Sequence, residues 1–312
     1  MPQIPKADFP GCALLQAPGS IFGEKAFFCF NGIRHHILNA EQIKHYGLTW
    51  PKDIFLVNAA VLESFSVGGW LPARFDHKFD SSEIKSSVTM REWMASSLNG
   101  IGLEVGAGAS AFPVPVDCKV IYGDRLSFDQ LISCLYPGQE IHNLVRPDIV
   151  TDFDVFQGIA DESLDFIIGC HVIEHVFDPI GTVRFAHRKL RPGGSLLLVV
   201  PDAGRTFDRD RPLTSLDHLK ADHFNPDPRR DREHYEEFYR LVRKTPEPEL
   251  ALKVESEFLS RGDLHAHVWS YDTFRQMIDF VDSTFCNWTK IVSNPTLSNI
   301  SLDIEFYWKL TK

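Results

Sequence analysis

The chain lacks the features of a membrane, secreted or disulfide-rich protein. Its 312 residues contain no apolar run of about eighteen residues, and the start MPQIPKADFPGC has no charged stretch followed by an apolar segment. The six cysteines are scattered and form no Cys-x-x-Cys pair, which argues against a disulfide framework and a cysteine-rich zinc site. We therefore expect a cytoplasmic protein without a membrane span.

Positive charge is also scarce. The chain has 32 lysines and arginines against 42 aspartates and glutamates, which gives a formal net charge of −10. Binding to duplex nucleic acid requires clustered basic side chains along the phosphates, so we expect no duplex partner. With 44% hydrophobic and 24% charged residues, the composition is that of a globular protein with a sizeable core.

Residues 1–75 differ from the rest of the chain in the pattern of secondary structure that they predict. The stretch AFFCFNGIRHHIL predicts two short strands around a turn at Asn31 and Gly32. NAEQIKHYGL then predicts a short helix ending at Gly47, and DIFLVN predicts a further strand. His35 and His36 would point to opposite faces of their strand, so we interpret them as surface or packing residues. A small N-terminal α+β module is expected.

From residue 76 to residue 312, strand-like and helix-like segments alternate. Such alternation predicts an α/β fold with a doubly wound, mostly parallel sheet that helices cover on both faces. The strand candidates are IGLEVG, CKVIYGD, PDIVT, LDFIIGC and GSLLLVVP, and an amphipathic helix ending in LRPGG is predicted between the last two. The C-terminal stretch contains two more strand-like runs, which would form an antiparallel hairpin at the sheet edge.

A glycine-rich loop follows the first of these strands. In LEVGAGASAFPVP, Gly106 and Gly108 lack a Cβ, which lets a ligand approach the backbone. With Ala111 the spacing also fits the dinucleotide fingerprint, so a nicotinamide-dependent oxidoreductase stays open as an interpretation. Pro113 and Pro115, however, remove amide donors that a pyrophosphate would need. A nucleotide-like ligand without a pyrophosphate is preferred.

An acidic residue in the same motif narrows the choice. Glu104 lies two positions before Gly106, where its charge would repel phosphate but attract an ammonium or sulfonium group. The EVGAG motif, an acid after the next strand and the later RPGGSLLLVVP resemble the class I S-adenosylmethionine-dependent methyltransferases. Strings such as VRPDIVTDFDVF and CHVIEHVFDPIG are most similar to bacterial members associated with sugar and surface-glycan pathways. The resemblance covers residues 76–312 and implies a seven-stranded Rossmann-like sheet.

This resemblance implies roles in binding S-adenosyl-L-methionine. Both loop glycines would pass beneath the methionine part, and Glu104 would hold its ammonium group. Asp124 stands where a carboxylate accepts hydrogen bonds from both ribose hydroxyls. Asp152 would meet the adenine amino group, and the Phe153 backbone amide would meet the adenine ring. The full predicted set is Glu104, Gly106, Ala107, Gly108, Asp124, Arg125, Asp152, Phe153, Cys170 and His171.

The motif HVIEH, residues 171–175, follows the fourth strand at the ligand-binding edge of the predicted sheet. One class of zinc peptidases shares this spelling, but carries it within a long helix and needs a third ligand. Ubiquinone-pathway and small-RNA methyltransferases have a similar E-x-x-E-H that binds a divalent metal, and His171 replaces its first glutamate here. We predict instead a site without metal, in which His171, Glu174 or His175 is the catalytic base and His267 is in reserve.

The stretch from residue 202 to residue 238 is polar, interrupted by prolines and too long for a simple connection, which is typical of a lid or substrate loop. Its residues Asp208, Arg209, Asp210, Arg211 and His218 could bind a hydroxyl-rich or anionic acceptor.

The expected reaction follows from the resemblance and from two absent motifs. The chain has neither the Asn/Asp-Pro-Pro-Tyr box used on exocyclic amines nor a Pro-Cys nucleophile, which argues against base methylation. We expect methyl transfer to a hydroxyl, or to an amine, of a small polar acceptor such as a sugar or glycan precursor. The alternative is a non-catalytic scaffold or sensor that binds S-adenosylmethionine.

Overall fold

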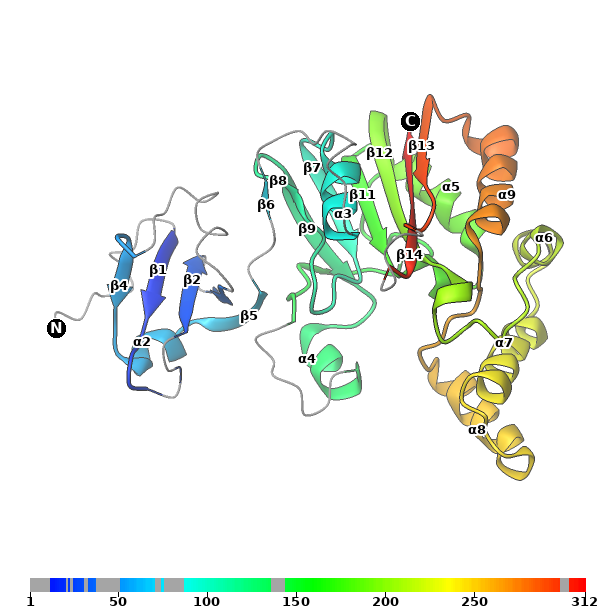
Figure 1. Ribbon diagram of the computed structural model, residues 1–312, viewed down its shortest axis with the longest axis horizontal. Helices are drawn as coiled ribbons and strands as arrows, with labels where there is room; N and C mark the ends of the chain where they lie inside the picture. The colour runs from blue at the N-terminus through cyan, green and yellow to red at the C-terminus, as the bar shows by residue number, and fades with distance from the viewer. Residues whose placement is uncertain are drawn as a thin grey trace.

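A seven-stranded sheet forms the centre of the protein. The computed structural model describes residues 12–20, 22, 25–30, 33–37, 51–70, 74–75, 87–135, 144–297 and 303–312. The strands lie in the order β10-β9-β7-β11-β12-β14-β13 (Figure 1). Their bounds are β7 Ile101–Val105, β9 Lys119–Asp124, β10 Ile149–Val150, β11 Leu164–Cys170, β12 Leu190–Pro201, β13 Lys290–Asn294 and β14 Glu305–Thr311. The first five in this order are parallel, and β14 runs antiparallel to both β12 and β13.

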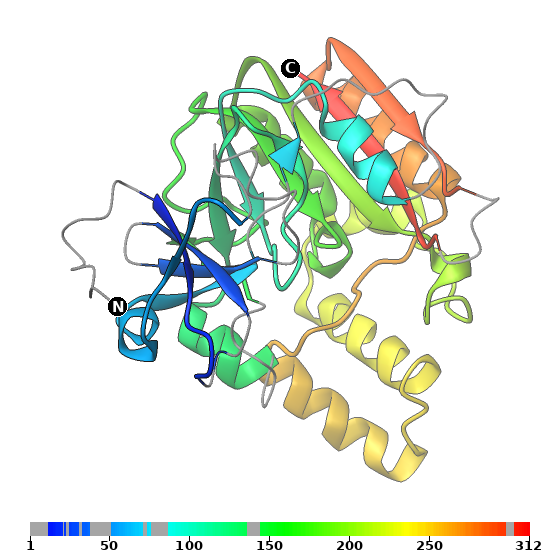
Figure 2. The same cartoon turned by 60° about the vertical axis from the view of Figure 1, so that its left-hand side comes forward.

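Alternate side chains of the central strands enter two separate cores. On β11, Phe166 belongs to one buried cluster and Ile167 to the other, because successive strand residues point to opposite faces. Helix α3 (Ser87–Ala95) closes the first cluster, and α5 (Pro179–Lys189) and α9 (Tyr271–Val281) close the second. Figure 2 shows these helices on the two sides of the sheet. The fold is therefore the layered α/β architecture that the sequence predicts.

A helical segment separates β12 from α9 and projects beyond the sheet (Figure 1). Its helices are α6 Leu216–Phe224, α7 Pro228–Leu241 and α8 Glu247–Ser260. The two ends of the segment lie together, because Asp202 and Trp269 form a β-bridge. The Ala203 amide also donates to the Trp269 carbonyl at 2.9 Å. The whole segment thus leaves and rejoins the domain at one point.

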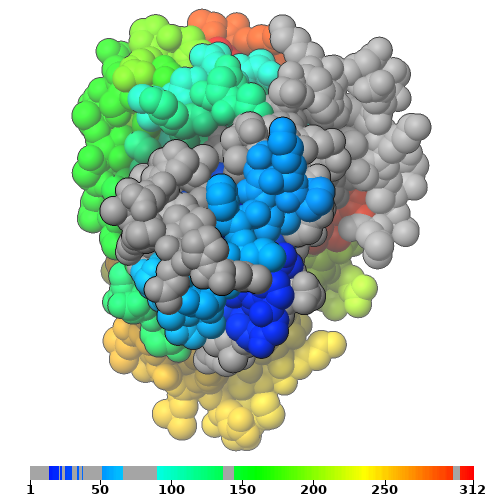
Figure 3. Space-filling model, turned by 90° about the vertical axis from the view of Figure 1, so that its left-hand side faces the viewer, coloured from blue at the N-terminus to red at the C-terminus, as the bar shows by residue number. Residues whose placement is uncertain are grey.

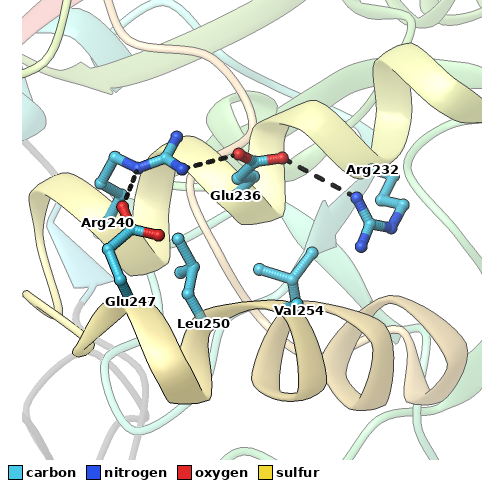
Figure 4. Close-up of a pocket in the computed structure, with 7 residues that line it drawn as sticks. Arg232, Glu236, Arg240, Glu247, Leu250 and Val254 are labelled. Atoms are coloured by element: carbon cyan, nitrogen blue, oxygen red, sulfur yellow. Dashed lines mark hydrogen bonds and ion pairs between the residues drawn. The ribbon is translucent and has the colours of Figure 1, made fainter.

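Helices α7 and α8 pack against each other away from the sheet. Leu250 and Val254 of α8 are buried in this contact. Arg240 of α7 lies 2.9 Å from Glu236 and 3.4 Å from Glu247 (Figure 4). The small pocket that these side chains line contains none of the predicted site residues. Exposed ion pairs stabilise little, so the apolar contact holds the two helices together.

A second sheet at one end of the molecule contains the strands up to residue 70 that the structure describes, whereas β6 (Arg74–Phe75) pairs with β8 (Val114–Pro115) (Figures 1 and 3). Its order is β4-β1-β2-β3-β5, with bounds β1 Cys12–Gln16, β2 Ala26–Phe30, β3 Ile33–His36, β4 Ile54–Leu56 and β5 Ser66–Trp70. Phe30 pairs with Ile33, which confirms the predicted hairpin. The turn residues 31–32 and the predicted helix at 39–48 lie outside the described residues. The division of the chain after residue 75 stays a prediction.

Most strand positions agree with the sequence, and one boundary shifts. The helix expected to run through Leu190 ends as α5 at Lys189, and Leu190 begins β12. The remaining elements of the described chain are α2 Ala59–Glu63, β6 Arg74–Phe75, β8 Val114–Pro115, α4 Phe128–Gln130, the π-helical turns Leu131–Leu135 and Asp282–Cys286, and the 3-10 turns Ile173–His175 and Ala203–Arg205. Every helix in the described ranges is too short or too polar to cross a membrane.

Candidate functional site

The carboxyl ends of the parallel strands form the candidate site. The strand order reverses between β7 and β11, which is where sheets of this kind bind ligands. Gly106 follows β7 with φ +71°, a backbone conformation that favours glycine. A Cβ on Gly106 would stand 2.9 Å from Val172 Cγ2, just after β11. The predicted cofactor loop and the HVIEH motif therefore meet at one point.

Glu104 holds the glycine loop from within the sheet. Its side chain is buried, and Oε1 accepts a hydrogen bond from the Phe112 amide at 2.8 Å. The Ser110 amide donates to the Ala107 carbonyl at 3.0 Å, which closes a turn around Gly108. Negative charge thus lies directly beneath the loop, where the predicted ammonium contact would form.

Asp124 ends β9, the strand beside β7. Its carboxylate is largely buried, and Oδ1 accepts a hydrogen bond from the Leu126 amide at 3.0 Å. Burial raises the pKa of this carboxyl. Arg125 points elsewhere, because its guanidinium donates to the Arg261 carbonyl at 3.3 Å and lies 3.5 Å from Asp263. Of the two residues, Asp124 therefore has the better position for a ribose contact.

The loop after β10 contributes two more acids. Asp152 is partly exposed, whereas Phe153 is buried and its ring fills the space beside Gly169. The contact of the Phe153 backbone amide with adenine stays a prediction. Asp154 was not among the predicted site residues. Burial, followed by repulsion from Asp152, raises the pKa of Asp154 to about 6.

The HVIEH motif is a tight turn and does not continue into an α-helix. Ile173–His175 form a single 3-10 turn, and α5 begins separately at Pro179. Asp178 caps α5 by accepting a hydrogen bond from the Gly181 amide at 2.8 Å. A proline disfavours helical backbone in the residue before it, which is why the two elements stay distinct.

His171 forms a hydrogen-bonded pair with Glu305 of β14. Its backbone is left-handed at φ +54°, which is uncommon for a residue with a side chain. Nε2 lies 2.8 Å from Glu305 Oε2, and the imidazole is 29% exposed. Arg91 Nε and the Tyr307 hydroxyl both donate to Glu305 Oε1, at 2.8 and 2.5 Å.

The charge of Glu305 decides which nitrogen of His171 carries the proton. Burial acts to raise the pKa of Glu305, but the bonds from His171, Arg91 and Tyr307 outweigh it and lower the pKa to about 2. Glu305 is therefore ionised and can only accept, so Nε2 of His171 donates. In the neutral tautomer with its proton on Nε2, Nδ1 carries the lone pair that a general base requires.

Cys170, the last residue of β11, precedes this pair. Its sulfur lies within 4.8 Å of potential ligand atoms of His171 and Glu305. Burial raises the pKa of the Cys170 thiol above its ordinary value. Because metals bind the thiolate, a protonated Cys170 is a poor ligand, and a contact with the cofactor suits it better.

Glu174 is completely buried at the centre of the turn. In the described chain neither of its oxygens has a hydrogen-bond partner. Three imidazole nitrogens surround Oε1: His171 Nδ1 at 3.9 Å, His175 Nε2 at 3.8 Å and His265 Nε2 at 3.9 Å. Glu174, His175 and His265 each offer a ligand atom within 4.8 Å of the others. This set could hold a divalent metal, although the sequence predicted none.

Further carboxylates hold the surrounding histidines. Asp208 Oδ2 lies 2.6 Å from His265 Nδ1, and Oδ1 accepts from Arg211 at 2.9 Å. Burial acts to raise the pKa of Asp208, but His265 and Arg211 outweigh it and lower the pKa. Asp208 and Arg211 are thus buried supports, whereas the other two charged residues of the DRDR run, Arg209 and Asp210, are exposed.

His267, the reserve candidate for catalysis, faces another group of histidines. Its side chain is fully buried, with the ring centroids of His234 and Trp269 at 4.7 and 5.6 Å. Burial lowers the pKa of His267 well below its usual range. Its backbone amide donates to the Glu174 carbonyl at 3.1 Å, so the main chain, rather than the ring, contacts the motif.

Sequence reasoning missed Glu305, Arg91, Asp154 and Asp263. Glu305 and Arg91 lie 134 residues after and 80 residues before His171 in the chain, so no local motif joins them. The one available signal was an acid at the start of the aromatic run EFYW in the strand string IEFYWKL. A charge at such a position in a buried strand calls for a partner.

The pair between His175 and Asp263 should make stability depend on pH. Asp263 Oδ1 lies 3.1 Å from His175 Nδ1. Burial acts to lower the pKa of His175, but Asp263 and Glu174 outweigh it and raise the pKa. The stabilisation is therefore complete below the unfolded pKa of about 6.5 and is lost as pH rises through the folded pKa. We expect His175→Asn to lower the free energy of unfolding, measured by urea denaturation, by about 1 kcal/mol more at about pH 6 than at about pH 9.

His187 provides a control of opposite sign for this measurement. Burial, with Lys312 adding to it, lowers the pKa of His187. Its contribution to stability is then present above the unfolded pKa and is lost as pH falls. His187→Asn should therefore lower the free energy of unfolding least at acidic pH. An equal penalty for His175→Asn at both pH values would contradict the assigned ion pair.

One comparison with known proteins shows the family of the chain. A family model described as a methyltransferase domain matches residues 75–240, more than half of the chain. One similar structure is a possible histamine N-methyltransferase from Thermotoga maritima, with 14% identity, a TM-score of 0.39, and 72% of this chain and 92% of that chain covered. A SAM-dependent methyltransferase from Methanosarcina mazei has 14% identity and a TM-score of 0.36, with 73% and 98% covered. The CurJ carbon methyltransferase has 13% identity and a TM-score of 0.36, with 69% of this chain and 49% of that chain covered. No curated protein matches the sequence significantly.

The matched range contains the glycine loop, Asp124 and the HVIEH motif, so the cofactor edge of the sheet lies within the family's domain. The residues there fit the cofactor, because Gly106 keeps the loop free of a side chain and Glu104 supplies a buried negative charge. The chain belongs to the methyltransferase domain family, with S-adenosyl-L-methionine as its cofactor.

Proposed function

We propose that the protein transfers the methyl group of S-adenosyl-L-methionine to a hydroxyl of a small polar acceptor, such as a sugar or glycan precursor. S-adenosylmethionine supplies a methyl carbon made electrophilic by the positive sulfur. The single observation that carries the proposal is the His171–Glu305 pair at the end of β11, next to the loop that contains Gly106.

His171 acts as the base in this proposal. An acceptor oxygen that attacks the methyl carbon breaks the carbon–sulfur bond, releases S-adenosylhomocysteine and must lose its proton. Nδ1 of His171 takes that proton, and the ionised Glu305 stabilises the resulting imidazolium through Nε2. Arg91 and Tyr307 hold Glu305 in position. This division of roles follows the general rule that a base is oriented by a third group.

The surface around His265, whose Nε2 lies 3.9 Å from Glu174 Oε1, supports a polar acceptor. Phe207 is 56% exposed, and the centroid of its ring lies 4.7 Å from that of His265. The ring of Phe207 would offer an apolar surface to one face of a sugar ring. Arg209 and Asp210 follow Phe207 and are exposed. Charged side chains next to an aromatic ring suit a ligand that has hydroxyls and an apolar face. The N-terminal sheet has no role in this proposal.

A second mechanism for the same reaction rests on Glu174, His175 and His265. These residues could hold a divalent cation, which would lower the pKa of an acceptor hydroxyl. Two imidazoles and one carboxylate favour metals such as Zn²⁺, Mn²⁺ or Fe²⁺ over Mg²⁺. The mechanisms differ in their critical residue: Glu305→Gln should impair the base mechanism, and His265→Ala the metal mechanism.

The experiment that tests the proposal is a screen for turnover. Purified protein is incubated with S-adenosylmethionine and free sugars, nucleotide sugars or matched amino sugars, and S-adenosylhomocysteine is measured by mass spectrometry. We expect release that depends on a hydroxyl acceptor and falls when that hydroxyl is replaced by hydrogen. Release only with amino sugars would replace oxygen by nitrogen as the acceptor atom.

The screen also separates the enzyme from a scaffold or sensor. A protein that binds S-adenosylhomocysteine but transfers no methyl group to any acceptor, with or without added Mn²⁺ or Zn²⁺, would contradict the proposal and favour the scaffold. Glu305→Gln serves as the matched control for background release, because it keeps the glycine loop and Asp124 intact.

A further inference from the structure

Four residues outside the proposed reaction form a second polar cluster. His218 and Asp222 lie one turn apart on α6, His234 lies on α7, and His267 lies just before α9. Each offers one potential ligand atom, and all four atoms lie within 4.8 Å of one another. Asp222, His234 and His267 are buried, and the side chain of His218 is 33% exposed. The cluster thus joins three segments and has one member at the surface.

The separations between the polar atoms are those of a compact coordination shell. Asp222 Oδ2 lies 3.1 Å from His218 Nε2 and 3.9 Å from His267 Nε2. His218 Nε2 and His234 Nε2 are 3.4 Å apart. Ligand atoms of a tetrahedral zinc ion, with bonds of about 2.0–2.1 Å, stand about 3.3 Å from each other. Two of the printed separations, 3.1 and 3.4 Å, are close to this value, and the others must shorten from 3.9 Å or more, within the 4.8 Å limit, for the four atoms to surround one ion.

Asp222 and His234 each have a further hydrogen bond to a residue outside the cluster, as is usual for metal ligands. Asp222 Oδ1 accepts a hydrogen bond from Arg230, which leaves Oδ2 facing the histidines. His234 forms a hydrogen bond with the backbone of Ala266. Outer contacts of this kind orient metal-binding side chains.

We propose that His218, Asp222, His234 and His267 bind one divalent transition metal ion of the zinc type. Three imidazole nitrogens and one carboxylate oxygen suit zinc, cobalt or nickel better than magnesium or calcium. A set of four protein ligands leaves no open position, so the ion has a structural role. The ion holds α6 and α7 against the segment before α9 that contains His267. The backbone amide of His267 contacts Glu174.

This site is separate from the Glu174, His175 and His265 group, and the test must distinguish them. The full-length protein is dialysed against a chelator, incubated with zinc, freed of excess metal and analysed by inductively coupled plasma mass spectrometry. We expect about one zinc ion per chain at this site and at least a tenfold loss of zinc affinity in His218→Ala and Asp222→Asn. His175→Ala and His187→Ala should retain that ion.

Two further readouts keep the proposal testable if one variant is unstable. His218 is at the surface, so His218→Ala should fold even if Asp222→Asn does not, and retained S-adenosylhomocysteine binding checks this. Cobalt in place of zinc should give the intense visible absorption of a tetrahedral site in wild type and not in His218→Ala. Wild type that binds no zinc would overturn the proposal. Zinc that stays in His218→Ala but leaves in His175→Ala would overturn it as well.

Discussion

Asp124→Ala should abolish measurable binding of S-adenosylhomocysteine. The Asp124 carboxylate at the end of β9 would accept hydrogen bonds from both ribose hydroxyls. Each hydrogen bond to a charged acceptor contributes about 1.5–3 kcal/mol to binding. Losing both therefore weakens binding by at least about a hundredfold. Calorimetric titration of wild type and variant measures the change directly. The binding of wild type should not depend on EDTA, because no predicted cofactor contact involves a metal.

Asp129→Ala is the matched control for this titration. Asp129 lies five residues further on, in α4, and its side chain is exposed. Removing it subtracts the same charge without touching the proposed ribose contact, so binding should be unchanged. Equal affinity in wild type and Asp124→Ala would place the ribose elsewhere. Asp152 and Asp154, which are both partly exposed, would then be the next carboxylates to test.

His171→Asn should lower methyl transfer by about 100- to 10,000-fold, the usual contribution of a general base. Asparagine is preferred over alanine because it tolerates the left-handed backbone at this position and cannot accept the proton. S-adenosylhomocysteine binding should persist, since the glycine loop and Asp124 are untouched. The rate is measured with an acceptor found in the turnover screen.

A double-mutant comparison links His171 to Glu305. Glu305→Gln should slow the wild-type enzyme but add little to His171→Asn, because Glu305 acts only through the imidazole. Independent, multiplying losses would mean that Glu305 contacts the acceptor itself. A rate in His171→Asn close to that of wild type would remove His171 from the chemistry and favour the metal-assisted mechanism.

The residues at the candidate cofactor edge could be predicted from the sequence because each belongs to a short local motif. Gly106, Asp124, Asp152 and His171 each stand at or just after the end of a strand, and parallel strands bring such ends to one edge. The strand run itself was visible from its apolar residues. The family resemblance implied a seven-stranded, mostly parallel sheet with an antiparallel C-terminal strand, and the structure confirms it.

The surroundings of His171 could not be read in this way. Glu305 reaches His171 only because β14 inserts antiparallel between β12 and β13, and Pro201 then pairs with Glu305. Nothing in the local sequence fixes that register. The tight turn of HVIEH was also hidden, since its spacing suits a helix and only the backbone geometry before Pro179 excludes one.

The paired ends of the segment between β12 and α9 have a consequence for the evolution of the enzyme. Asp202 and Trp269 are neighbours in space, so the main chain leaves the rest of the domain and returns to it at adjacent positions. A graft with both junctions at such neighbouring positions leaves the host scaffold continuous. The candidate cofactor contacts all precede this segment, whereas Phe207 and His265 lie inside it. Exchange of this one cassette between relatives could therefore change the acceptor while conserving the methyl donor.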